Sequence, residues 1–159
     1  MYATKGNEVY VNLYISNTTE ILLKNKTLQL SQKTDYPWDG KVEIDVLNNE
    51  PIDATIKLRV PGWARNEVMD GDLYRYMDKE NPAIQLSVNG ESKNVSVEDG
   101  YITLQNQSWK QNDKIVIAFE MPIRKVISHE LVAANIGKMA LERGPWSTVL
   151  KKSTTPKVC

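Results

Sequence analysis

The sequence predicts an all-β protein: an antiparallel, jelly-roll-like β-sandwich of about eight strands over Glu8 to Pro122. Short runs of residues alternate between apolar and polar side chains, which is the pattern of strands with one buried face. Turn residues recur between these runs, and no stretch shows the apolar period of an α-helix. A closed barrel of the same strands is the alternative architecture.

The alternation is clearest in the first half of the chain. Apolar residues stand at every second position from Val9 to Ile15, so we expect a strand over Glu8–Ile15. The turn chemistry of Ser16–Thr19 ends this strand. The remaining strands of this half are expected at residues 20–23, 27–33, 42–46 and 56–60.

The second half opens with an interruption. Residues 65–82 lose the alternation, and we expect a long surface loop in which Leu73–Met77 forms a helical turn or an extra strand. Asn89–Gly90 marks a hairpin, because a two-residue turn of this kind needs positive φ. The strand over 115–119 is apolar on both faces and is expected to be central or covered. The other strands of this half are expected at residues 84–88, 95–97 and 101–104.

The pattern changes after residue 124. We expect a sandwich domain over residues 1–124, followed over 125–159 by a linker and a partial second β segment. Gly137–Pro145 predicts one strand and a turn of this segment. The tail, Trp146–Cys159, is polar, basic and unpatterned, and we expect it to be either disordered or the product of a frameshift.

Composition excludes several classes of function. The 20 basic and 20 acidic residues balance, which removes the positive surface that binding to nucleic acid needs. No stretch approaches the roughly 20 apolar residues of a membrane span, so neither nucleic acid nor a membrane is an expected partner. One cysteine, Cys159, and one histidine, His129, cannot form an all-protein zinc site, and we expect no metal and no cofactor. Residues 1–8 do not have the pattern of a signal peptide.

Several motifs occur together, in order, along nearly the whole chain. They are Val9–Ile15, Tyr36–Gly40, Leu58–Ala64, Val88–Gly90, Gly100–Tyr101, Trp109 with Asp113, and Gly137–Pro145. In this combination the chain resembles the C-terminal, non-catalytic part of glycoside hydrolase family 127, the bacterial β-L-arabinofuranosidases. The resemblance implies a parent protein with an (α/α)6 barrel followed by β-sandwich domains.

The resemblance also implies an accessory role for this chain. The family's chemistry uses a cysteine nucleophile held with other cysteines and a glutamate around zinc, plus a glutamate acid/base, all in or at the end of the barrel. Cys159 matches none of these positions, so no catalytic residue is carried over and we expect no enzyme activity of this chain. The implied partner is the catalytic barrel, and a contact between two copies of the chain stays open. The implied location is periplasmic or secreted if the parent carries a signal peptide, and cytoplasmic otherwise.

The chain departs from the family after Gly144-Pro145. Family members tend to continue with a sequence like L-V-Y-C-A-E-E, whereas Trp146–Lys152 follows here. A plausible coding sequence for the family version gives this run when it is read one base out of frame. We therefore hypothesise a frameshift in the gene or its recorded sequence, with the frame restored near Pro156.

The candidate site residues are carbohydrate contacts in the two aromatic turns. Trp38 and Trp63 lie in these turns, and aromatic rings stack on the apolar faces of sugars. The residues that could hydrogen-bond to sugar hydroxyls are Tyr36, Asp39, Arg59 and Arg65. The structural alternative is that each tryptophan caps one end of the core, with its indole N–H bonded to backbone. A carbohydrate-binding module that uses both rings requires both indoles to be exposed.

Other acidic and turn residues have structural interpretations. Asp39–Gly40 and Asn89–Gly90 are expected in turns because these residue types adopt the backbone conformations that turns require. The acid pairs, Asp70 with Asp72 and Glu98 with Asp99, lie in predicted turns. We expect solvent to surround these carboxylates, so that they lack the shifted pKa and the pocket that glycosidase chemistry needs. No residue is therefore nominated as catalytic.

Overall fold

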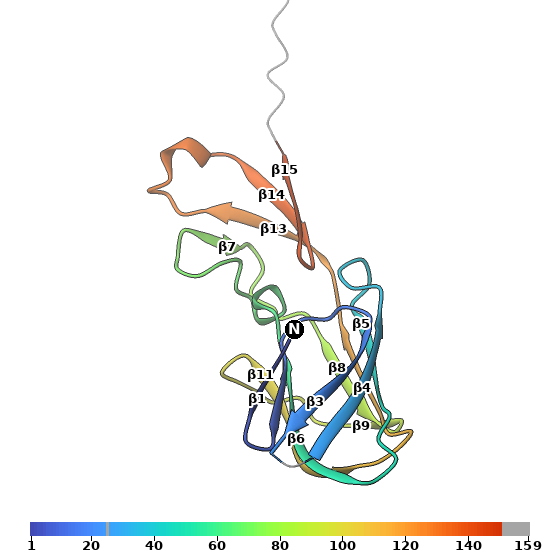
Figure 1. The fold of residues 1–159 in the computed structure, drawn as a ribbon. Coiled ribbons are helices and arrows are strands. Elements are labelled where there is room, and N and C mark those ends of the chain that lie inside the picture. The colour runs from blue at the N-terminus through green and yellow to red at the C-terminus, as the bar shows by residue number, and fades with distance from the viewer. Residues whose placement is uncertain (25, 151–159) are drawn as a thin grey trace, which may run out of the picture. The chain divides into compact units, whose positions relative to one another are not determined.

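The computed structural model describes residues 1–24 and 26–150, which form an all-β structure (Figure 1). Its helical turns in this part of the chain are two short 3-10 segments, η1 (Gly62–Arg65) and η2 (Ala133–Asn135). None of the helices in these two ranges is long and apolar enough to cross a membrane.

The chain divides into two compact units. The first unit contains Met1–Pro61 and Ala83–Glu120, and the second contains Gly62–Pro82 and the described residues from Met121 onward. This division differs from the expected boundary at residue 124. Residues 62–82, expected as a loop of the first domain, belong to the second unit because a strand within them pairs with a strand that follows Met121.

The first unit contains a five-stranded sheet in the order β1-β2-β6-β11-β10. Its strands are β1 (Tyr2–Lys5), β2 (Glu8–Val11), β6 (Ile52–Arg59), β10 (Val97–Glu98) and β11 (Tyr101–Trp109). The alternation does not predict β1, which forms an antiparallel hairpin with β2 through a turn at Gly6. β2 and β6 pair in parallel, whereas the other pairings of this sheet are antiparallel.

The first unit also contains a six-stranded sheet in the order β3-β4-β5-β12-β8-β9. Its strands are β3 (Asn17–Leu23), β4 (Lys26–Thr34), β5 (Lys41–Val46), β8 (Ile84–Val88), β9 (Glu91–Ser92) and β12 (Lys114–Phe119). β12 lies between β5 and β8, so its predicted central position is confirmed. Since these strands form two open sheets, the β-sandwich is confirmed and the barrel alternative is wrong.

The core of the first unit follows the alternation of the strands. In β5 the fully buried residues are Val42, Ile44 and Val46, and the polar residues between them lie on the outer face. Trp109, at the end of β11, is buried and donates its indole N–H to the Ala54 carbonyl oxygen at 3.0 Å. Hydrophobic burial of this kind is the main term that stabilises the sandwich.

The first predicted strand is shorter than expected. β2 ends at Val11, and the pattern of burial then reverses: Tyr14 is buried, while Leu13 and Ile15 are exposed. The reason is the Tyr14 hydroxyl, which donates a 2.6 Å hydrogen bond to the Arg59 carbonyl oxygen. The aromatic side chain therefore enters the core in place of its aliphatic neighbours.

The Asn89–Gly90 hairpin is confirmed, with φ of 54° and 82° at the two turn residues. Its return strand is shorter than expected, because β9 ends at Ser92. Val97 instead belongs to β10 of the other sheet, where the tight turn at Asp99–Gly100 pairs β10 with β11.

The second unit contains a four-stranded antiparallel sheet in the order β15-β14-β13-β7. Its strands are β7 (Tyr74–Tyr76), β13 (Ile123–Ser128), β14 (Met139–Arg143) and β15 (Trp146–Leu150). β7 shows that the extra strand, and not the helical turn, is the correct alternative for Leu73–Met77. The expected disorder of the tail is wrong for Trp146–Leu150, which pair with β14. The rest of the tail, including the hypothesised restoration of the frame near Pro156, lies outside the described residues.

Candidate functional site

The turn between β4 and β5 carries the first aromatic motif and is held by short-range contacts. The Trp38 backbone N–H donates to the Asp35 carbonyl oxygen at 2.8 Å, which closes the turn. Gly40 lies directly against β12, where the Phe119 N–H donates to the Gly40 carbonyl oxygen at 3.0 Å. A Cβ atom on Gly40 would lie 2.0 Å from the Phe119 carbonyl oxygen, so only glycine allows this approach.

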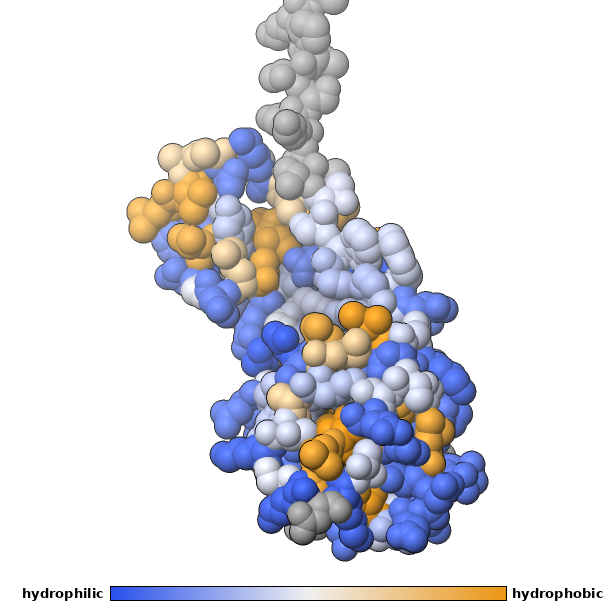
Figure 2. Space-filling model, in the orientation of Figure 1, coloured by the Kyte–Doolittle hydropathy of each residue, from blue (hydrophilic) through white to orange (hydrophobic). Residues whose placement is uncertain are grey.

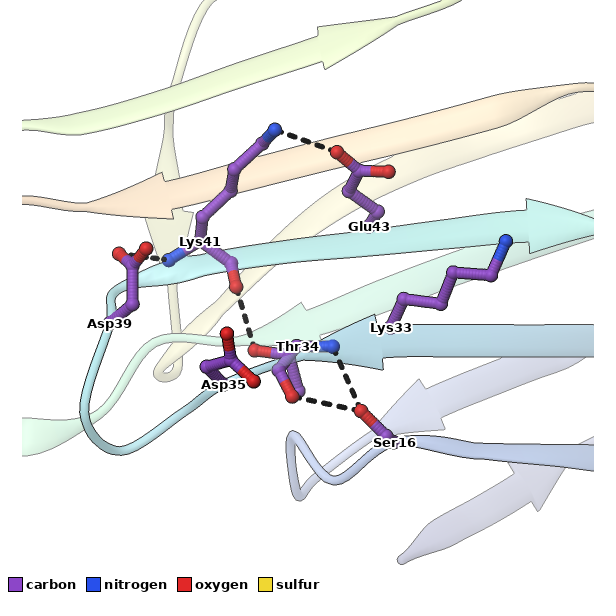
Figure 3. Close-up of a pocket in the computed structure, with 7 residues that line it drawn as sticks. All are labelled: Ser16, Lys33, Thr34, Asp35, Asp39, Lys41 and Glu43. Carbon is purple, nitrogen blue, oxygen red and sulfur yellow. Dashed lines mark hydrogen bonds and ion pairs between the residues drawn. The ribbon is translucent and has the colours of Figure 1, made fainter.

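A polar pocket of about 350 Å³ opens beside this turn (Figure 3). Its walls are Ser16, Lys33, Thr34, Asp35, Asp39, Lys41 and Glu43. The Ser16 hydroxyl donates to the Thr34 carbonyl oxygen at 2.8 Å, and the Thr34 hydroxyl donates to the Lys41 carbonyl oxygen. Both hydroxyl groups are therefore hydrogen-bonded to backbone carbonyl groups of the pocket wall.

The lysines of the pocket are paired with acids on the outer face of the six-stranded sheet. Lys41 Nζ lies 2.6 Å from a Glu43 carboxylate oxygen, and Lys33 Nζ lies 3.1 Å from Asp45. Hydrogen bonds from Lys41 and then Lys114 lower the pKa of the Glu43 carboxyl. Because these pairs are exposed to solvent, they contribute little to stability, but they neutralise the ammonium groups at the pocket.

Four of the six candidate site residues lie in the first unit. Tyr36 is half-buried, with its ring edge-on to Tyr14 at 5.9 Å between centroids. Arg59 is exposed at the end of β6, and its carbonyl oxygen accepts the Tyr14 hydroxyl. Trp38 and Asp39 are both exposed, with 66% of Trp38 accessible. The structure thus brings Tyr36 and Arg59 together around Tyr14, a residue that the sequence analysis does not select.

The other two candidates, Trp63 and Arg65, lie on η1 in the second unit, and Trp63 is only 8% exposed. A buried ring offers no face to a sugar, so Trp63 fits the structural interpretation. The platform of two exposed tryptophans is therefore not formed. Arg65, at the end of η1, pairs with Glu67 at 2.8 Å.

The second unit contains a buried polar cluster around Arg124, which is 5% exposed. The Arg124 guanidinium donates to Asp78, to Asn66 and, at 3.4 Å, to the Trp63 carbonyl oxygen. It also lies 3.5 Å from the centroid of the Tyr76 ring.

The cluster continues to an acid on the neighbouring strand, because the Tyr76 hydroxyl donates to Glu142. Burial is the main reason that the pKa values of both the Tyr76 and Glu142 side chains are raised. The sequence analysis does not select this cluster. The available signal is that Arg124 shares the inward parity of Val126 on β13.

The remaining acids show no arrangement for chemistry. Asp70, Asp72, Glu98 and Asp99 are exposed, as their position in turns predicts. Within residues 1–24 and 26–150, no three histidine, cysteine or acidic side chains are grouped so that they could hold a metal ion.

The fold and the pocket together define a β-sandwich region with an open, polar surface site. Residues 8–121 match the family model described as the middle domain of the β-L-arabinofuranosidases of glycoside hydrolase family 127. The chain therefore belongs to glycoside hydrolase family 127, as its motifs predict. The matching model is that of the middle domain of these proteins.

Individual relatives agree with this assignment. The chain is 30% identical over 145 residues to the non-reducing end β-L-arabinofuranosidase of Bifidobacterium longum subsp. longum, covering 88% of this chain and 19% of the relative. Among solved structures, a family 127 β-arabinofuranosidase is similar with 42% identity and a TM-score of 0.86, over 92% of this chain and 23% of that one. The Geobacillus stearothermophilus T6 β-L-arabinofuranosidase of the same family is similar with 28% identity and a TM-score of 0.76, over 92% and 20%. The chain thus spans about a fifth of the length of these relatives.

Proposed function

We propose that this chain is a non-catalytic accessory region of a β-L-arabinofuranosidase-like glycoside hydrolase, and that it supports the catalytic (α/α)6 barrel of the same protein. This proposal rests on the match of residues 8–121 to the middle domain. It also rests on the length of the chain, which is about a fifth of that of its relatives. A protein of that length has several further domains, and the chemistry that the family resemblance implies belongs to the barrel.

The charged groups of the second unit support a structural role. Glycoside hydrolysis needs two carboxyl groups that flank a sugar in an accessible cleft. Asp78 and Glu142, the acids of the Arg124 cluster, are instead bonded to Arg124 and Tyr76. Their hydrogen bonds hold the sheet to η1 and its loop.

The second unit also offers an apolar surface for the contact with the rest of the enzyme (Figure 2). Ile123 and Trp146 are exposed on opposite sides of Arg143 in one row across the sheet. Leu131 and Ile136, which flank η2, are exposed as well. Exposed apolar side chains can form a protein contact, and we assign these four to the contact with the parent protein's other domains, the barrel included.

Expression of the 159-residue chain together with the catalytic barrel of the same enzyme tests this role. We expect the two to copurify, and the chain to raise the melting temperature and arabinosidase activity of the barrel. Ile123→Glu should weaken the association, because it places a charge in the apolar contact. Leu22→Glu is the matched control, since Leu22 is equally exposed on β3 of the first unit.

Two outcomes contradict the proposal. Hydrolysis of an arabinoside by the purified chain alone would show that it is catalytic. A barrel that neither binds the chain nor changes in activity or melting temperature would remove the supporting role.

A further inference from the structure

We infer that the turn Asp35–Gly40 is a binding site for neutral carbohydrate, in which the Trp38 indole stacks on a sugar ring and the Asp35 and Asp39 carboxylates accept hydroxyl protons. This site is separate from the supporting role proposed above and does not depend on it.

The turn Asp35–Gly40 holds an exposed aromatic ring on a fixed backbone. Trp38 is 66% exposed, although the residues on either side of it are held in place. Tyr36 packs edge-on against Tyr14, and Gly40 lies in backbone contact with Phe119. A backbone that is already fixed loses little conformational freedom when a ligand binds the ring it carries, so the turn is suited to recognition.

The pocket beside this turn keeps hydrogen-bond acceptors that other groups of the described chain do not use. The hydroxyl groups of Ser16 and Thr34 are used by backbone groups. Asp39 accepts one hydrogen bond, from the Lys41 N–H at 3.2 Å, through one of its two carboxylate oxygens. Among the described residues, no hydrogen bond is made by the Asp35 carboxylate, which also lines the pocket. Figure 3 shows both aspartates at the ends of the turn.

These acceptors define the class of ligand. Ionised carboxylates only accept hydrogen bonds, so they select a ligand that is rich in O–H donors. An anion is disfavoured because Lys33 and Lys41 are already paired with acids and three carboxylates line the pocket. A metal cation is disfavoured because the described part of the chain contains no cluster of three possible ligands. A neutral sugar satisfies the acceptors and offers an apolar face to the indole.

The assignment to a sugar, in preference to a protein partner, follows from the polar pocket beside the turn that carries the ring. A protein contact centred on a tryptophan usually surrounds it with apolar, water-excluding neighbours. Here the pocket beside the turn has five charged side chains among its seven residues. Since the chain belongs to a family of arabinofuranosidases, L-arabinose and short arabinofuranosyl oligosaccharides are the probes to use.

Isothermal titration of the 159-residue chain with these sugars tests the site. We expect Trp38→Ala to weaken binding at least about tenfold, as for an aromatic contact at the centre of a site. Asp39→Asn, which keeps the acceptor for the Lys41 N–H, and Asp35→Asn should each weaken binding about tenfold. Trp146→Ala is the matched control, because it removes an exposed indole from the second unit, and it should bind the sugars as the wild type does.

Several results would overturn the inference. One is a wild-type chain that binds no arabinosyl sugar at millimolar concentration, and another is an equal loss of binding in Trp38→Ala and Trp146→Ala. Tighter binding of an anionic sugar such as glucuronate would contradict a neutral ligand. If Trp38→Ala bound sugar normally but lost its association with the barrel, the turn would be a protein contact. Because association with the barrel is measured separately, failure of this site leaves the supporting role standing.

Discussion

Gly40 supports a specific prediction, because its place against β12 leaves no room for a side chain. In Gly40→Ala, the new Cβ would lie 2.0 Å from the Phe119 carbonyl oxygen, and that oxygen must retreat by about 1 Å to reach the shortest tolerated contact of 3.0 Å. Overpacking of this kind costs about 1 to 3 kcal/mol. The same movement weakens the hydrogen bond from the Phe119 N–H to the Gly40 carbonyl oxygen, which is worth about 1 kcal/mol. We therefore expect Gly40→Ala to lower the free energy of unfolding of the first unit by about 3 kcal/mol.

Urea unfolding followed by tryptophan fluorescence, to which buried Trp109 contributes, measures this loss. With a dependence on urea of about 1.5 kcal/mol per molar, the midpoint should fall by about 2 M. Gly90→Ala is the matched control: its φ is +82° and no atom lies within 4 Å of the new Cβ, so it should cost only about 1 kcal/mol of backbone strain. A loss in Gly40→Ala no larger than that in Gly90→Ala would refute the steric argument.

Three further predictions concern buried polar groups. Tyr14→Phe removes the hydrogen bond to the Arg59 carbonyl oxygen, and it should cost the first unit about 1 to 2 kcal/mol in urea unfolding. Arg124→Met breaks the buried cluster and should destabilise the second unit by about 2 kcal/mol, with faster hydrogen exchange in β13 and β14 as the measurement. The pKa of Glu142 is raised, so the folded state binds the proton of this carboxyl group more tightly than the unfolded chain does. The proton's contribution to stability is therefore present below pH 4.5 and is lost as the pH rises through the folded pKa. Glu142→Gln should therefore be more stable than the wild type at pH 7, and the melting temperatures of the two should converge as the pH falls below 4.5.

The strands of the sandwich could be predicted because their information is local. Alternating residues such as Val42, Ile44 and Val46 define a buried face without knowledge of the partner strand. The Asn89–Gly90 turn is equally local, since positive φ is a property of its own two residues. Element type therefore follows from short windows of sequence. The pairing of the strands does not follow from such windows. For example, β2 and β6 pair in parallel, and no turn motif in the sequence predicts this pairing.

Features that depend on distant residues were beyond such reasoning. β7 looks like part of a loop because its three residues form a strand only when β13 provides the partner. Arg124 is a charged residue on a short strand, yet it is buried, and its guanidinium is bonded to Asp78 and Asn66, more than 40 positions away. The reason is the same in both cases: the stabilising contact is formed by another segment of the chain, and a local pattern does not identify that segment.

The two aromatic turns show how far similar motifs diverge once their surroundings are known. Both place a tryptophan next to proline and glycine, yet Trp63 is buried on a 3-10 turn whose carbonyl oxygen accepts from Arg124, while Trp38 faces solvent. Gly40 explains part of the difference. It is not among the glycines with positive φ, so its role is close approach: it brings the turn against β12 and fixes the backbone there. Burial already accounts for Trp63 as a structural residue. The turn around Trp38 is fixed at its backbone and leaves most of the indole accessible to solvent, so the ring is available to a ligand.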